Sequence, residues 1–326
     1  MTIDTKILTT LRGVGNGGVA GTELSQKLGI SRAAVWAHIQ ELRSLGYEIE
    51  ASPHLGYRLV NVPDVLHSDH LLSSLGRTKV VGRDIRVFEE TTSTNDVVEK
   101  LAHDGVPEGV VVFAESQSRG RGRLGRKWIS PPRKGLWFSI LLRPQIRPAA
   151  VTQLTIAAAT ALFRAIRAQT GVIAEIKWPN DIMVRGKKTA GILTELSAEL
   201  DKVKYVILGI GVDVNLSASE LPTDLRKLAT SLKIESGVHQ NRAALAVKIL
   251  QELDRDYDRV CSGRFEAVAN EWEEHCSTIG HRVAIHIGDR KVQGCAESLD
   301  TDGALLLRTQ HGRLERIIGG DVTVEK

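Results

Sequence analysis

Cysteine is scarce in this chain of 326 residues, and long apolar runs are missing. The three cysteines, Cys261, Cys276 and Cys295, are widely spaced, and no two of them form a Cys-x-x-Cys pair. This pattern argues against a structural zinc site and favours a reducing compartment. The first residues lack the apolar core of a signal peptide, and no later segment is expected to span a bilayer. We therefore expect a cytoplasmic protein with no membrane partner and no metal held by protein ligands.

Acidic residues are missing from one long stretch. Residues 116–147 include nine basic residues and no acidic one. The densest part is residues 119–128, the basic loop, in which arginine and glycine alternate. Glycine lets backbone N–H groups approach a ligand, and guanidinium groups bind phosphate or carboxylate, so this loop predicts an anion-binding site. Taken alone, the loop is also compatible with a solvated segment that has no specific ligand.

Two familiar nucleotide-binding patterns are present in part and are rejected. Gly120, Gly122 and Gly125 match the dinucleotide pattern G-x-G-x-x-G, which requires a helix directly afterwards. Pro131 and Pro132 follow instead and disfavour that helix. Residues 186–189 resemble the end of a phosphate-binding P-loop, but they lead into a predicted strand rather than a helix.

Residues 1–62 predict a small winged helix-turn-helix domain. A first helix is expected near residue 7, and a second over residues 22–28 with Thr22 as its cap. After Gly29 comes a third helix, which Ser31 caps, and residues 46–60 form a hairpin, the wing. The residues expected to contact DNA are Thr22, Ser31, Arg32, Ala33 and Trp36.

The charge of this domain is nearly balanced, with six basic residues against five acidic ones in residues 1–60. Few phosphate contacts mean weak binding by one copy, so specific binding is expected to need a dimer on two half-sites. The alternative is a domain used only for packing.

The rest of the chain predicts an α+β fold in two further domains. Residues 63–70 are the expected linker, residues 71–276 a mixed-sheet domain, and residues 277–326 a small β-barrel of the SH3-like kind. Strands are expected at residues 79–81, 84–88, 109–113, 136–142, 182–184, 189–196 and 203–214. Helices are expected at residues 97–103, 149–170, 242–260 and 265–275. Gly209 and Gly211 are spaced to admit a flat group against the strand backbone.

Four motifs then need one explanation. In chain order they are Ser93-Thr-Asn-Asp, Gln117-x-x-Gly-Arg-Gly-Arg, Lys177-Trp-Pro-Asn-Asp and Lys188-Thr-Ala-Gly. With these motifs the sequence resembles biotin–protein ligases, specifically the bifunctional kind that also represses biotin-synthesis genes. The resemblance covers essentially the whole chain, and it implies a ligase core of the class II synthetase-like, lipoate-ligase type.

The resemblance implies a reaction in two steps. Biotin and ATP give biotinyl-5′-AMP and pyrophosphate, and a lysine of the biotin carboxyl carrier protein then attacks the activated biotin. Mg²⁺ is expected to be held largely by the phosphates. The regulatory half implies that the adenylate promotes a homodimer, which binds operator DNA of biotin-synthesis genes.

Roles for single residues follow from the same resemblance. Ser93, Thr94, Asn95 and Gln117 would bind the biotin head group. Arg121, Gly122 and Arg123 would lie on a loop that covers the adenylate, and Lys188 would contact the biotin carboxylate and the α-phosphate. Trp128, Asn180 and Asn215 would form the nucleotide side. Lys188, Arg123 and Asp181 are the expected catalytic residues, with Asp181 either accepting the proton of the acceptor lysine or pairing with Arg123.

One position departs from the family, and three other functions compete. Asp213 stands where the family often has the first asparagine of an Asn-x-Asn run, so no role is predicted for it. Lipoate–protein ligases share the core fold but would not predict the basic loop or the winged helix. A biotin-sensing transcription factor with a vestigial ligase is disfavoured by the intact Arg121, Arg123, Lys177 and Lys188. A working ligase whose winged helix is only structural is the remaining alternative.

Overall fold

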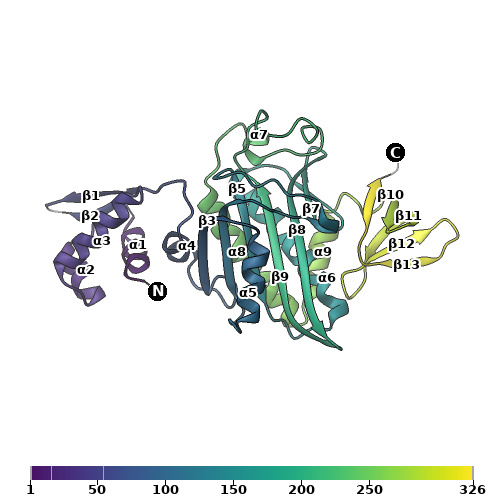
Figure 1. The fold of residues 1–326 in the computed structure, drawn as a ribbon, viewed down its shortest axis with the longest axis horizontal. Coiled ribbons are helices and arrows are strands. Elements are labelled where there is room, and N and C mark those ends of the chain that lie inside the picture. The colour runs from purple at the N-terminus through teal and green to yellow at the C-terminus, as the bar shows by residue number, and fades with distance from the viewer. Residues whose placement is uncertain (1, 16, 54, 325–326) are drawn as a thin grey trace. The chain divides into compact units, whose positions relative to one another are not determined.

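The computed structural model describes residues 2–15, 17–53 and 55–324. Residues 16 and 54, at the predicted end of the first helix and in the predicted turn of the wing, lie outside the described residues, as do residues 1, 325 and 326. The chain divides into two compact units (Figure 1). The N-terminal unit is Met1–Arg77 with Asn241–Val247, and the main unit is Thr78–Gln240 with Lys248–Lys326.

The N-terminal unit contains the predicted winged helix-turn-helix. Its elements are α1 (Ile3–Gly13), α2 (Gly21–Leu28), α3 (Arg32–Ser44), β1 (Glu48–Ser52) and β2 (Gly56–Asn61). The Ser31 hydroxyl accepts a hydrogen bond from the Ala34 N–H at 3.1 Å, which confirms the predicted cap of α3. The predicted cap of α2 is wrong, because that helix begins at Gly21 and Thr22 lies within its first turn.

The predicted linker is wrong in its second half. A further helix, α4 (Ser68–Leu75), begins inside residues 63–70 and packs on α1. Its Leu71 and Leu75 are buried, and Arg12 of α1 donates a hydrogen bond to the Ser73 hydroxyl at 2.5 Å. The N-terminal unit therefore extends to Arg77 rather than ending near residue 62.

The main unit is built on a seven-stranded mixed sheet in the order β3-β4-β5-β9-β8-β7-β6 (Figure 1). β3 and β4 pair in parallel, and every other neighbouring pair is antiparallel. The strands are β3 (Asp84–Thr91), β4 (Val110–Gln117), β5 (Gly135–Leu142), β6 (Glu175–Lys177), β7 (Asp181–Val184), β8 (Lys187–Glu199) and β9 (Lys202–Asp213).

The strand predicted at residues 79–81 is wrong. These residues form a turn, and their three backbone N–H groups donate to the Asp254 carboxylate at 2.7, 2.8 and 2.9 Å. One carboxylate thus satisfies the donors that a neighbouring strand would otherwise bind.

Five helices accompany this sheet. They are α5 (Thr94–His103), α6 (Thr152–Thr170), α7 (Leu232–Ser236), α8 (Arg242–Cys261) and α9 (Phe265–Glu274), with 3₁₀ turns at Arg123–Gly125 and Pro148–Val151. α5 packs on β4, β5 and β9, where Val98 contributes to one core cluster with Val112 and Ile207. The 3₁₀ turn at Arg123–Gly125 lies within the glycine pattern, and the next element after Gly125 is the strand β5, so no helix follows the pattern, as predicted.

The segment Pro148–Thr170 is long and apolar enough to cross a membrane by length and composition, contrary to our expectation for this chain. It is a core helix in this structure, because 78% of its most apolar window is buried. α6 packs against β6, β7 and β8 of the sheet and against α9.

The C-terminal part of the main unit is a separate antiparallel sheet of five strands in the order β13-β12-β11-β10-β14. The strands are β10 (Arg282–Ile287), β11 (Arg290–Leu299), β12 (Leu305–Thr309), β13 (Leu314–Ile317) and β14 (Asp321–Val324). Four of these agree with strands that the sequence predicts, at residues 282–287, 291–294, 304–308 and 314–318. The fifth, β14, was not predicted, although it pairs with β10 along its whole length.

Three helices behind the sheet are joined by one arginine. Arg164 of α6 has a side chain that is 15% exposed, and it donates to Glu252 at 2.9 Å and to Glu271 at 2.6 Å. Its third partner is Asp256, which is fully buried. Burial raises the pKa of Asp256, while Arg164 opposes that rise. Arg164, together with Arg259 at 3.2 Å and Arg255 at 3.8 Å, therefore makes a buried carboxylate tolerable at this position.

Replacing Arg164 with alanine is predicted to lower the free energy of unfolding by about 1–3 kcal/mol, because it removes the group that joins three carboxylates and leaves the buried Asp256 with only Arg255 and Arg259. Urea denaturation measures this change. Arg167→Ala, an exposed position on the same helix, is the matched control and should change stability by less than about 0.5 kcal/mol. Equal effects of the two substitutions would contradict this account of the cluster.

Candidate active site

A cavity of about 460 Å³ lies over one end of the sheet in the main unit. Gly209, Gly211 and Asp213 of β9 line it, and they lie on the same face of the sheet as Tyr205 and Ile207, which pack on α5. α5 therefore covers one half of this sheet face, and the cavity begins at the N-terminus of that helix.

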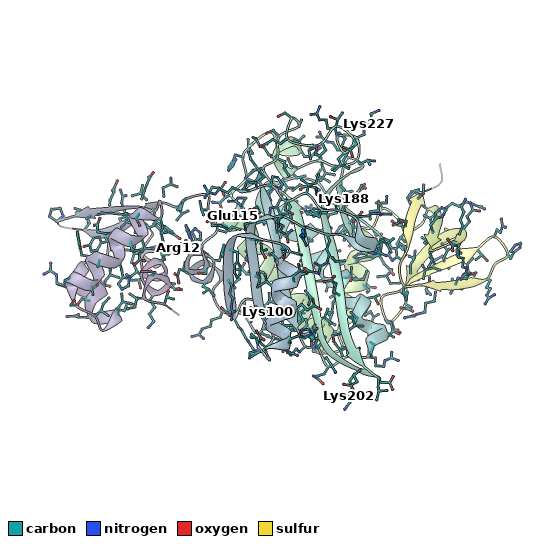
Figure 2. The ribbon with its side chains drawn as sticks, in the orientation of Figure 1. Arg12, Lys100, Glu115, Lys188, Lys202 and Lys227 are labelled. Carbon is teal, nitrogen blue, oxygen red and sulfur yellow. The ribbon has the colours of Figure 1, made fainter. Side chains whose placement is uncertain are left out.

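Lys188 marks the same end of the sheet. Figure 2 shows it on the side nearest the α7 region, whereas Lys202 lies at the opposite end of the β8–β9 hairpin. Gly191, two residues before Leu193 on β8, also lines the cavity.

Three glycines leave the strand backbone beside this cavity uncovered, so that other side chains can lie directly against it. A Cβ atom on Gly211 would lie 2.6 Å from the Trp128 indole, and one on Gly191 would lie 3.0 Å from the same ring. A Cβ on Gly209 would lie 2.3 Å from Oδ1 of Asn95. The glycine spacing was predicted to admit a flat group, and in this structure the flat group against Gly211 is the Trp128 ring.

The first turn of α5 forms a buried polar floor. Ser93, Thr94 and Asn95 are each less than 5% exposed. Oε1 of Gln117 accepts a hydrogen bond from the Thr94 N–H at 2.8 Å, and its Nε2 donates to Ser130 at 2.8 Å. Ser93 makes no capping hydrogen bond with its side chain. Gln117 thus does the capping, which leaves the Ser93 hydroxyl available for a ligand.

The arginines of the basic loop differ in their partners. Arg121 pairs with Glu195 and Asp96, and Arg126 pairs with Asp321 of β14. Arg123 instead donates to the neutral amide of Asn180 at 3.1 Å. Burial lowers the pKa of Arg123, although Asp321 and Asp181 counter that effect. Of these three arginines, Arg123 is the one whose hydrogen-bond partner is uncharged, and it lines the cavity.

Lys188 is held by two neighbours. Its Nζ lies 2.5 Å from Oδ1 of Asp181 and 5.2 Å from the centroid of the Trp128 ring. Asp181 was expected to pair with Arg123 or to act as a base, and the structure pairs it with Lys188. The indole Nε1 of Trp128 is buried and has no hydrogen-bond partner among the described residues. A buried donor at the cavity wall favours a ligand that accepts a hydrogen bond there.

Comparison with known proteins finds related families for all three predicted domains. Residues 5–58 match an HTH domain, residues 87–213 the biotin/lipoate A/B protein ligase family, and residues 278–324 the biotin protein ligase C-terminal domain. The chain is 39% identical over 304 residues to the bifunctional ligase/repressor BirA of Bacillus spizizenii, and the match covers 93% of each chain. This chain belongs to the bifunctional ligase/repressor family.

Two more distant members of this ligase group agree. The bifunctional ligase/repressor BirA of Escherichia coli is 29% identical over 94% of this chain and 92% of its own. The structure of a biotin protein ligase from Aquifex aeolicus in complex with biotin and ATP is similar with a TM-score of 0.64 and 29% identity. That match covers 75% of this chain and 99% of the Aquifex chain.

In this member of the ligase/repressor family, the predicted nucleotide contact of Asn215 stays a prediction, and its side chain already has partners within the chain. Its side chain is 1% exposed, and its amide exchanges two hydrogen bonds of 2.9 Å with the backbone of Gln240. Asn215 lies outside the residues that line the cavity, because β9 has already ended at Asp213. Its amide instead fixes the long connection between β9 and α8.

Asp213 was assigned no role and lines the cavity. It is 7% exposed, and burial raises its pKa from the ordinary 3.8 to about 8, while Lys188 opposes the rise. The position could have been found from the sequence, because strand alternation places residues 209, 211 and 213 on one face. Asp213 therefore puts a carboxyl with a raised pKa in the site.

The expected DNA-contacting residues form one exposed set in the N-terminal unit. Thr22 lies on α2, Ser31 caps α3, and Arg32, Ala33 and Trp36 lie on α3. All five are exposed, and Trp36 is 57% exposed although it is a large aromatic residue.

Asp213→Asn is predicted to change how stability depends on pH. Because the pKa of this carboxyl is higher in the folded chain than in the unfolded chain, the folded state binds more protons between about pH 4 and about pH 8. Its stability therefore falls as pH rises through that window, and asparagine removes the loss. The variant should gain melting temperature over the wild type at pH 8 relative to pH 5, by roughly 2–4 °C for each kcal/mol. Thermal unfolding of ligand-free protein measures the gain, with the exposed Asp224→Asn as control. A difference that is the same at both pH values would contradict the prediction.

Proposed function

We propose that this chain joins biotin to ATP, releasing pyrophosphate, and then transfers biotin from biotinyl-5′-AMP to a lysine of the biotin carboxyl carrier protein. The observation that carries the proposal is one cavity with two different parts. A buried floor of neutral polar groups lies beside Arg123 and Lys188, in a chain of the ligase/repressor family. A neutral head group and a charged reaction centre need such a pair of environments.

The floor suits the ureido ring of biotin. That ring is uncharged and offers both donors and an acceptor, which hydroxyl and amide side chains match. We assign Ser93, Thr94, Asn95 and Gln117 to it, with Gln117 also capping α5. The carboxylate tail of biotin then extends toward Lys188, which lines the same cavity.

In the first step a carboxylate oxygen of biotin attacks the α-phosphorus of ATP, and the bond to pyrophosphate breaks. Negative charge is concentrated where these groups meet, so fixed cations lower the barrier; one preorganised donor is typically worth roughly 10²–10³ in rate. Arg123 and Lys188 are placed for this role. The side chain of Arg121 is not, because Asp96 and Glu195 already bind its guanidinium group.

In the second step the acceptor lysine attacks the acyl carbon, and AMP leaves. That lysine must first lose a proton, and with an ordinary pKa near 10.4 only about one in 10³ is neutral at pH 7. Asp181 is our candidate acceptor for the proton, and this role requires its ion pair with Lys188 to open. The predicted role of Asp181 is thus linked to the movement of Lys188 toward the phosphate.

We place Mg²⁺ on the phosphates of ATP rather than on a site made by the protein. The cavity has few free carboxylates: Asp181 is paired with Lys188, and the carboxyl of Asp213 has a raised pKa. Among the described residues, the one group of side chains close enough to hold a metal ion is Asp4, His38 and Glu41 in the N-terminal unit. When bound with ATP, the ion would offset charge on the departing pyrophosphate.

We further propose that the winged helix binds operator DNA of biotin-synthesis genes, and that the adenylate favours a homodimer with two DNA-binding helices. The exposed α3 face supports this proposal, and so does the HTH match. The winged helix as a purely structural unit is the competing proposal, motivated by the nearly balanced charge of residues 1–60. A cytoplasmic location stays a prediction from the three free cysteines.

Biotin, and not lipoate, is predicted to support ATP–pyrophosphate exchange by the purified protein. Lys188→Ala should lower the biotin-dependent exchange rate by roughly 10²–10³, because a fixed cation at the reaction centre is lost. Lys187→Ala, one residue earlier on the same strand and outside the cavity lining, is the matched control and should retain exchange. Exchange that depends on lipoate, or equal rates for the two variants, would refute the assignment.

Binding to upstream DNA of biotin-synthesis genes is predicted to require biotin together with ATP. Arg32→Ala should weaken that binding at every sequence tested and reduce the salt slope by about two for the homodimer, because one phosphate contact is lost for each of its two copies. Fluorescence anisotropy against salt concentration measures both effects, with carrier biotinylation as the activity control. Absence of DNA binding in the wild type, with carrier biotinylation intact, would favour the structural winged helix.

A further inference from the structure

Glu195 of β8 joins two parts of the site that are far apart in sequence. Its Oε2 accepts a hydrogen bond from Nδ2 of Asn95 at 2.6 Å, at the polar floor. The same carboxylate accepts from Nε and Nη2 of Arg121 in the basic loop, at 3.1 and 3.0 Å. Glu195 is outside the residues that line the cavity, so it holds both groups from behind.

The contact with Arg121 has the geometry of a strong pair. Two N–H groups of one guanidinium face the two oxygens of one carboxylate, which gives more orientation than a single ion pair. A third N–H group bonds Asp96, the residue after Asn95 in the first turn of α5. Arg121 lies between Gly120 and Gly122, two residues with little conformational restriction of their own. Its hydrogen bonds to Glu195 and Asp96 therefore hold an otherwise flexible segment in place.

The contact with Asn95 fixes the orientation of a floor residue. The Asn95 side chain is 4% exposed, and its Oδ1 accepts from the Ser139 hydroxyl at 2.5 Å while Nδ2 donates to Glu195. Because an ionised carboxylate accepts and cannot donate, Glu195 requires the amide to present Nδ2 on its side. Ser139 in turn accepts a hydrogen bond from the Thr94 hydroxyl at 2.7 Å, and the backbone N–H of Thr94 donates to Gln117 at 2.8 Å. A continuous series of hydrogen bonds therefore runs from Gln117 to Arg121.

We propose that Glu195 is a positioning residue that couples ligand binding at the floor to closure of the basic loop. The Glu195 carboxylate holds the Asn95 amide in the orientation that fits the biotin head group. The same carboxylate holds Arg121 in the position that keeps the basic loop over the cavity. This rests on the proposed function, since biotin is the ligand assigned to the floor. Without Glu195, Arg121 loses two of these three hydrogen bonds, and the loop opens more often.

The test is amide hydrogen exchange of residues 119–127, measured with and without biotin plus ATP. In the bound state, Glu195→Ala should exchange in this loop roughly fivefold to thirtyfold faster than the wild type, as expected for losing one charge-assisted contact. Glu195→Gln keeps an acceptor and should lie between the two. Glu199→Ala on the same strand, where the removed partner is the exposed Lys204 at 2.7 Å, is the matched control and should exchange like the wild type.

A double variant separates positioning from general destabilisation. If Glu195 acts through Arg121, adding Glu195→Ala to Arg121→Ala should speed exchange of the loop little further. The Michaelis constant for biotin should rise more than the turnover number falls. Fully additive effects, or wild-type protection of the loop in a Glu195→Ala protein with unchanged urea midpoint, would overturn the inference. A wild-type loop that biotin and ATP do not protect would overturn the proposed function as well, and the two failures are thus distinguishable.

Discussion

The site depends on a gap in the side chains of the sheet. At Gly191, Gly209 and Gly211 the strand backbone is bare, so the Trp128 ring and the Asn95 amide can lie directly against it. A Cβ atom at Gly209 would overlap Asn95 in the first turn of α5, and one at Gly211 would overlap the Trp128 ring of the basic loop. Trp128 is the last residue of the basic loop, and Asn95 lies in the first turn of α5. The bare strand backbone therefore positions the charged part of the cavity, beside the loop, relative to the neutral polar part at α5.

The number of arginines in the basic loop does not set how much positive charge is available to a ligand. That depends on which arginines already pair with carboxylates of the chain. The excess of positive charge in residues 116–147 suggests several equivalent anion-binding groups. In the folded chain, carboxylates on α5, β8 and β14 bind Arg121 and Arg126, whereas Arg123 has the Asn180 amide as its partner. Two arginines therefore serve to hold the loop, and a third keeps its charge for a ligand. The availability of Lys188 to a ligand is intermediate. Asp181 and the Trp128 ring hold its ammonium group, but a competing anion could displace the Asp181 carboxylate.

The sequence predicted well wherever a short motif or a strong periodicity acts locally. The winged helix, the strands around the sheet centre and the cap at Ser31 follow from such signals, and Ser93, Gln117, Arg123 and Lys188 do meet at one cavity. The failures have a common physical cause, which is a partner far away in the chain. Residues 79–81 have a strand-like composition, but Asp254 takes their N–H groups. Glu195, which joins Asn95 to Arg121, belongs to no motif and was not predicted at all.

The short strand β14 belongs to two structures at once. Its residues pair with β10 of the C-terminal sheet, while Gly320, Asp321 and Val322 line the cavity and Asp321 holds Arg126. Anything joined to the chain directly after β14, such as an affinity tag or a fused enzyme, would be tethered only a few residues from the bound ligand. For protein engineering, an addition at this end of the main unit would therefore begin beside residues that line the cavity.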